Sequence, residues 1–69
     1  MIRHLTPRQQ QVIELASQGL SARQIANEVG ISSRTVEIHR GAAIKALGAV
    51  NIVHAAVIYE RQVAQGGVA

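Results

Sequence analysis

Short segments that begin with a helix-capping residue and end at a glycine divide this 69-residue sequence along its length. The candidate capping residues are Thr6, Ser21, Ser32 and Asn51, and the candidate stop glycines are Gly19, Gly30 and Gly48. Capping side chains accept hydrogen bonds from the free N–H groups of a first helical turn, and glycine ends a helix in the left-handed conformation. Gln9 and Gln24 stand three residues after their caps and complete two capping boxes. The pattern predicts four short helices over about 7–18, 22–29, 33–47 and 52–64, with Gly66 and Gly67 fraying the end of the last one.

The apolar residues available for a core favour helices over strands. Hydrophobic residues make up 48% of the chain but aromatic residues only 1%, so Leu, Ile, Val and Ala must fill the interior. A chain of this length is near the lower limit for an unaided hydrophobic core. Because we find no repeat, linker or second domain, we expect one all-α domain over residues 1–69.

Several residue types that carry chemistry are absent or scattered. The chain has no cysteine, three dispersed histidines, no aspartate, and four glutamates on separate predicted helices. Because this leaves no thiolate site, ligand cluster or acid–base pair, we expect no enzymatic activity, no metal and no cofactor. No apolar run approaches the roughly 18 residues of a membrane span, and no signal peptide is visible. We expect a cytoplasmic protein without a membrane partner.

Positive charge is concentrated in the third predicted helix. Seven Lys and Arg against four acidic residues give a net charge of +3, the sign expected for a nucleic-acid partner. Arg34, Arg40 and Lys45 all fall in this segment, where only Glu37 opposes them. The clustering of positive charge in this segment therefore indicates a nucleic-acid partner more strongly than the modest net charge does.

A helical wheel at about 100° per residue divides this segment into two faces. Val36, Ala43 and Leu47 form a narrow stripe toward the core, with Arg40 on the flank where its head can reach a phosphate. The opposite face holds Arg34, Glu37, Ile38, Gly41, Ala42 and Lys45. Such a face can be solvated and held by intrahelical ion pairs. Small residues in mid-helix lower its stability, however, and instead favour close approach to a groove, where an exposed Ile38 suits a thymine methyl.

The other three predicted helices each have an apolar face. The first is expected to bury Val12, Leu15 and Ala16, and the second Ile25, Ala26 and Val29. The fourth carries an apolar stripe of Ile52, Ala56, Tyr59 and Val63. Val53 and Val57 then face away from the core, which makes them candidates for a contact with a second copy.

Residues 22–47 have the form of a helix-turn-helix: a short helix, a glycine-containing turn and a longer helix. Ala26, Gly30 and Val36 stand where this motif needs a small packing residue, a positive-φ turn and a core residue. The chain resembles the LuxR-type (FixJ- or GerE-like) helix-turn-helix domains of bacterial transcription regulators over residues 5 to about 60. The matching segments are LTPR at 5–8, GLS at 19–21, IA at 25–26, GIS at 30–32, RTVEIHR at 34–40 and KALG at 45–48.

The resemblance implies a four-helix domain that binds double-stranded DNA and forms a homodimer through its fourth helix. The family's base-reading positions correspond to Glu37, Ile38 and Gly41, and Arg34 and Lys45 lie on the same face. Phosphate contacts are expected from residues of the second and third helices and their caps: Ser21, Arg23, Ser32, Ser33, Thr35, His39 and Arg40. Val53 and Val57 are the expected dimer contact.

The chain departs from the family at some of these positions. Gln9 replaces the usual glutamate, and Ala43 replaces a larger apolar residue. Gly41 has no side chain with which to read a base, so Arg34, Glu37 and Lys45 must supply direct readout there. His39 matches the family, but it also fits a structural role at the edge of the core.

Three functions remain open at the level of sequence. The first is sequence-specific transcription regulation by a dimer, either as a stand-alone regulator, which Met1 and the absence of a linker before Leu5 favour, or as the excised domain of a longer protein. The second is a promoter-recognition module of a sigma factor, which the apolar helix after Asn51 argues against. The third is a protein-interaction module that binds another regulator through the fourth helix. RNA polymerase or another regulator is a further candidate partner.

Overall fold

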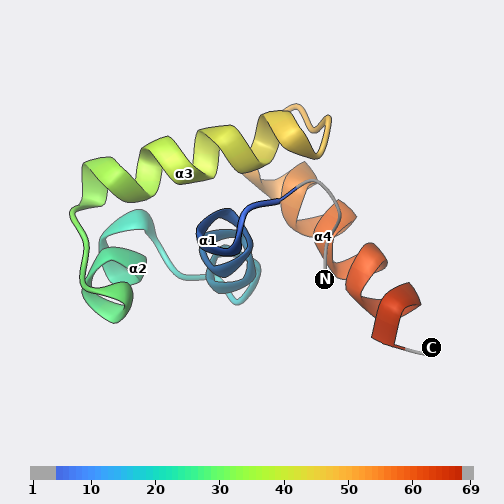
Figure 1. Cartoon of the computed structure of the whole chain (residues 1–69), viewed down its shortest axis with the longest axis horizontal. Coiled ribbons are helices and arrows are strands. Elements are labelled where there is room, and N and C mark those ends of the chain that lie inside the picture. The colour runs from blue at the N-terminus through green and yellow to red at the C-terminus, as the bar shows by residue number, and fades with distance from the viewer. Residues whose placement is uncertain (1–4, 68–69) are drawn as a thin grey trace.

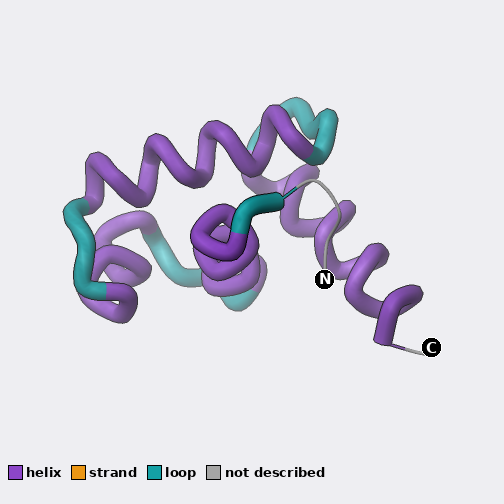
Figure 2. The backbone as a smooth tube through the Cα atoms, viewed as in Figure 1, coloured by secondary structure: helices purple, strands orange, loops and turns teal. Residues whose placement is uncertain are grey.

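The computed structural model describes residues 5–67, and side chains to residue 64. This part of the chain contains four α-helices and no strand: α1 (Pro7–Ser17), α2 (Ala22–Val29), α3 (Ser33–Ala46) and α4 (Ile52–Gly67). The long α3 lies across one side of the molecule, α2 and α4 lie toward its two ends, and α1 lies between them (Figure 1). Short loops join the helices (Figure 2). The expected all-α, four-helix fold is confirmed.

The predicted helix starts are confirmed by hydrogen bonds at each cap. Thr6 and Ser21 form the two capping boxes with Gln9 and Gln24, through bonds of 2.8–3.2 Å. At α3, the Ser32 hydroxyl accepts from the Thr35 N–H at 3.1 Å. Each of these bonds joins two residues that are three apart in the sequence. The first turns of these helices could therefore be predicted from the sequence alone.

The cap of α4 has a partner that the sequence analysis did not include. Asn51 Oδ1 accepts from the His54 N–H at 2.9 Å, as expected for a cap. His54 Nδ1 in turn accepts from the Val50 N–H at 3.1 Å. The imidazole thus stands at the same position as the glutamines of α1 and α2, but it accepts from the residue before the cap instead of from the cap residue.

The helix ends differ slightly from the prediction. α1 and α3 end at Ser17 and Ala46, each one residue early, before the left-handed Gly19 and Gly48. The predicted end of the last helix near residue 64 was wrong, because α4 continues to Gly67. An established helix gains one hydrogen bond for each added residue, and a glycine costs only about 1 kcal/mol against alanine.

The core consists of two clusters on either side of α1. Val12 belongs to the cluster with Ile25, Ala26 and Val36 of α2 and α3. Its neighbour Ile13 belongs to the other cluster, with Leu5, Ala43, Ala55 and Tyr59. Two adjacent residues of α1 thus belong to different clusters, each of which also includes a residue of α3, and both are fully buried. The predicted inner face of α1 lacked Ile13, and its Leu15 and Ala16 are only half-buried.

The predicted core stripe of α4 was partly wrong. Ala55 and Tyr59, one turn apart, point inward, whereas Ile52 and Ala56 are half-buried and Val63 is 43% exposed. The C-terminal half of α4 extends beyond the other helices (Figure 1), so Val63 has little to pack against. Which residues of α4 are buried therefore depends on where α4 crosses α1. A helical wheel carries no information about that crossing.

Candidate nucleic-acid interface

A tight turn fixes α3 against α2. Gly30 adopts φ 83°, and the N–H groups of Gly30 and Ile31 both donate to the Ala26 carbonyl, at 2.8 and 3.1 Å. Ala26 is 5% exposed and lies in one cluster with the fully buried Val36. The small residue, the turn glycine and the core residue thus have the positions predicted for a helix-turn-helix.

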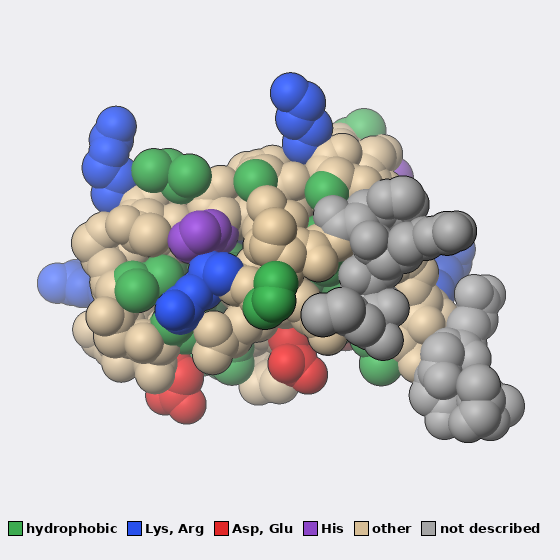
Figure 3. All heavy atoms as spheres, viewed as in Figure 1, with side chains coloured by type: hydrophobic (Ala, Val, Ile, Leu, Met, Phe, Trp, Pro, Cys, Tyr) green, Lys and Arg blue, Asp and Glu red, His purple; other side chains and the backbone are tan. Residues whose placement is uncertain are grey.

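The outward face of α3 gathers all five residues predicted to read bases. Arg34, Glu37, Ile38, Gly41 and Lys45 are exposed, while Val36 and Ala43 on the opposite face are fully buried. Figure 3 shows Lys and Arg side chains projecting from the edge that α3 forms, whereas the acidic side chains visible in this view lie at the opposite edge. The outward face of α3 is therefore a basic surface, and the buried residues on the opposite side of the helix fix its orientation.

Two residues in the middle of this face are unusual for a surface in water. Ile38 is 61% exposed, although it is a large aliphatic side chain. Gly41, one turn later, has no positive φ, and a Cβ added there would meet no atom within 4 Å. Neither the backbone nor the packing of the fold requires a glycine at this position. Folding therefore does not explain this glycine, whereas the close approach to a groove that the sequence predicts for it stays a prediction.

The seven residues predicted to contact phosphates lie along α2, α3 and their caps. Ser21 and Ser32 are exposed cap residues whose hydroxyls already accept from backbone N–H groups. Arg23 on α2 is exposed. The other four, on α3, are half-buried: Ser33, Thr35, His39 and Arg40. The N-termini of α2 and α3 supply the N–H groups and the positive dipole ends that favour anions.

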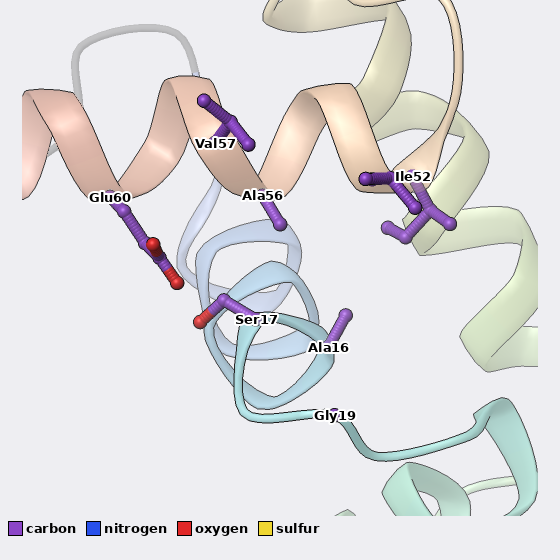
Figure 4. A pocket seen from close by; sticks show the side chains of 8 residues that line it. Ala16, Ser17, Gly19, Ile52, Ala56, Val57 and Glu60 are labelled. Carbon is purple, nitrogen blue, oxygen red and sulfur yellow. The ribbon is translucent and has the colours of Figure 1, made fainter.

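The two residues predicted to contact a second copy lie on α4. Val53 is 71% exposed and Val57 is 42% exposed, so both face away from the core as expected. They border an open groove of about 260 Å³ between α4 and the end of α1 (Figure 4). Ala16, Ser17 and Gly19 contribute the α1 side of this groove. That side was not among the predicted site residues, although the three small residues at the predicted helix end were a visible signal.

No helix within residues 5–67 is long and apolar enough to cross a membrane. In the same part of the chain, no group of three His, Cys, Asp or Glu side chains comes together in a way that could hold a metal ion.

Comparison with known proteins gives one consistent family. Residues 3–59 match the family described as "Bacterial regulatory proteins, luxR family" (GerE). The transcriptional activator protein BjaR1 of Bradyrhizobium diazoefficiens is 48% identical over 54 residues, which cover 78% of this chain and 22% of the relative. The transcriptional regulatory protein UhpA of Salmonella typhimurium is 42% identical over 52 residues, 75% of this chain and 26% of the relative.

The chain thus spans about a quarter of the length of these relatives. No solved structure gave a significant match. The family match covers most of the chain, including all of the helix-turn-helix and the exposed face of α3. The chain therefore belongs to the luxR family of bacterial regulatory proteins.

Proposed function

We propose that this domain binds double-stranded DNA by inserting α3 into the major groove. The observation that carries the proposal is the outward face of α3. It combines exposed basic residues with an exposed Ile38 and with Gly41, a glycine that the fold does not require. A helix fits the major groove of B-DNA, and a small residue lets its backbone approach the bases. The residues assigned to base edges are Arg34, Glu37, Ile38, Gly41 and Lys45.

Phosphate contacts on either side of the groove would fix the position of α3. Their assigned residues are Ser21, Arg23, Ser32, Ser33, Thr35, His39 and Arg40. Hydroxyls, basic side chains and helix N-termini are the groups that proteins commonly use for this purpose. These contacts supply affinity and register, while the base contacts supply sequence preference.

The biological role that we assign is transcription regulation by a homodimer on a two-fold DNA site. The names of the relatives describe transcriptional activators and regulatory proteins, and the family is one of bacterial regulators. Val53 and Val57 provide an exposed apolar strip outside the DNA-facing surface. A two-fold protein contact matches a two-fold operator, because each half-site then receives one α3.

The DNA-binding proposal is tested by removing two charges from α3. Arg34→Ala with Arg40→Ala should weaken binding to a duplex selected from a random library. It should also flatten the dependence of log K on log salt by about one unit for each lost phosphate contact. The matched control is Arg8→Ala with Arg61→Ala, which removes the same charge from exposed positions on α1 and α4.

Both pairs are compared on a duplex with one half-site, so that dimerisation does not enter. Circular dichroism at the start of each titration checks that the helices are intact. Equal losses in the two double variants would mean that only net charge matters, and α3 would no longer be the DNA-reading helix.

A further inference from the structure

The middle of the outward face of α3 is apolar, although its two ends are basic. Ile38 is 61% exposed, and Gly41 and Ala42 follow it three and four residues later, so all three are neighbours on the helix surface. Arg34 lies one turn before Ile38, and Lys45 lies one turn after Gly41, and both are exposed. A Cβ added at Gly41 would meet no atom within 4 Å, so the space there is open. The face therefore presents one aliphatic side chain beside an open space, between two cations.

The flanking charges and the apolar centre together point to one group on DNA. The two cations attract phosphates, which brings the centre of the face against the bases. Ile38 can neither donate nor accept a hydrogen bond, and the backbone N–H and C=O groups in the middle of a helix bond to one another. The apolar group that base pairs present in the major groove is the C5 methyl of thymine. Glu37 lies about 100° around the helix from Ile38, so it faces a neighbouring base and does not replace this contact.

We propose that Ile38, with the open space at Gly41, recognises the C5 methyl group itself and not the base that carries it. 5-Methylcytosine has its methyl group on the same ring atom as thymine, whereas cytosine and uracil have none there. One position of the half-site is therefore read as methylated or unmethylated at C5, and methylation of a cytosine at this position raises the affinity of the domain. This inference rests on the proposed function, because it concerns how α3 reads DNA.

The first test removes the methyl groups of the DNA one at a time. Each thymine of one half-site, selected from a random library, is replaced in turn by deoxyuridine, which pairs with adenine in the same way but lacks the C5 methyl. At one position the unmodified domain should lose about fourfold in affinity, the effect of one buried group of this size. Ile38→Ala shortens an exposed side chain and favours the helix, so it should fold. This variant should bind the thymine and deoxyuridine duplexes equally at that position.

A matched control shortens an exposed aliphatic side chain outside α3. Val50 is 81% exposed and lies between α3 and α4. Val50→Ala should keep the fourfold preference for thymine over deoxyuridine. If Val50→Ala removes the preference as Ile38→Ala does, Ile38 is not the residue that reads the methyl group. Circular dichroism checks the helicity of both variants.

The second test adds the methyl group to cytosine. The T·A pair at the sensitive position is replaced by C·G, with the cytosine either unmodified or methylated at C5. Methylation should raise the affinity of the unmodified domain about fourfold and leave that of Ile38→Ala unchanged. Because the two cytosine duplexes differ only in one methyl group, a domain that prefers thymine but binds both equally would show that another part of the T·A pair is read.

The outcomes separate this inference from the proposed function. Failure of the unmodified domain to bind any half-site would contradict DNA binding itself. Equal affinity for thymine and deoxyuridine at every position, or the same preference in Ile38→Ala as in the unmodified domain, would overturn the recognition of the methyl group alone and leave α3 as the DNA-binding helix.

Discussion

Tyr59 is the chain's one aromatic residue (Phe, Trp, Tyr), and it is only 5% exposed, in the cluster with Ile13 and Ala55. Burial raises the pKa of its hydroxyl above the usual value of 10.0, and the negative charge of Glu14 raises the pKa further. A hydrogen bond with the Gln10 side chain acts in the opposite direction. The hydroxyl therefore prefers its neutral form more strongly in the folded chain than in the unfolded one.

This preference predicts a loss of stability in alkali. Below about pH 10 the hydroxyl is neutral in both states, and the full contribution is present. As pH rises further, the unfolded state loses the proton first, so the free energy of unfolding should fall until the folded pKa is passed. Denaturant unfolding followed by circular dichroism measures this slope. Tyr59→Phe, which keeps the ring, should remove the part of the slope that belongs to the hydroxyl, and an unchanged slope would contradict this assignment.

The contrast between caps and core shows what a residue-level analysis can predict. Thr6, Ser21 and Ser32 were assigned correctly because their partners lie three residues away in the sequence. Ile13 and Ala55 were missed because their burial depends on the angle at which α1 and α4 cross. Capping is a local interaction, whereas that angle is decided by side chains from several helices together.

At the scale of elements, α3 combines a buried inner face with an outer face on which Gly41 lowers the stability of the helix. Gly41 has open space around it and no unusual φ, so alanine fits the fold there. Gly41→Ala should raise the free energy of unfolding by up to about 1 kcal/mol through helix propensity. Gly41→Leu should fold as well but bind DNA far more weakly, because the bulky side chain separates the helix from the bases. Thermal unfolding and DNA titration of both variants measure the two effects.

Gly30→Ala is the matched control for the stability effect. Gly30 has φ 83° at the end of α2, a conformation that strains residues with a Cβ. The same substitution should therefore destabilise the domain at Gly30 and stabilise it at Gly41. Normal DNA binding by Gly41→Leu would show that α3 does not approach the bases at this point.

The sequence predicted the candidate site on α3 more fully than the one on α4. The outward face of α3 was predicted correctly except for Ala42, which is half-buried, because Val36 and Ala43 fix the helix orientation and the remaining face follows from helical geometry. On α4 the same procedure placed Val53 and Val57 on the outside correctly but placed Val63 in the core. The groove beside α4 could not be predicted, because it depends on how two helices meet.

At the scale of the whole molecule, α1 holds the two candidate surfaces, on α3 and on α4, in a fixed relation. It packs against each of the other three helices, through Val12 on one side and Ile13 on the other. The basic face lies on α3, and an exposed valine ridge, formed by Val53 and Val57, lies on α4. Because both are attached to the same rigid core, a contact made through α4 determines where the second copy's α3 can reach the DNA.

This coupling predicts the effect of placing a charge on the ridge at Val57. Val57 is 42% exposed, so Val57→Glu leaves the core intact but puts two like charges close together at the centre of the proposed contact. The small interface should be weak without DNA, since contacts below about 1,200 Å² are commonly transient. The measurable loss should therefore be in cooperativity between half-sites, while affinity for one half-site changes little.

Val57→Lys is the control for the electrostatic effect of the substitution on DNA binding. Lysine also places like charges at the contact, but it attracts DNA where glutamate repels it. Both variants should lose cooperativity, whereas their affinities for a single half-site should shift in opposite directions and only slightly. If Val57→Lys binds two half-sites as cooperatively as the unmodified domain, the ridge on α4 is not where the two copies meet, and the second α3 must be positioned by another surface.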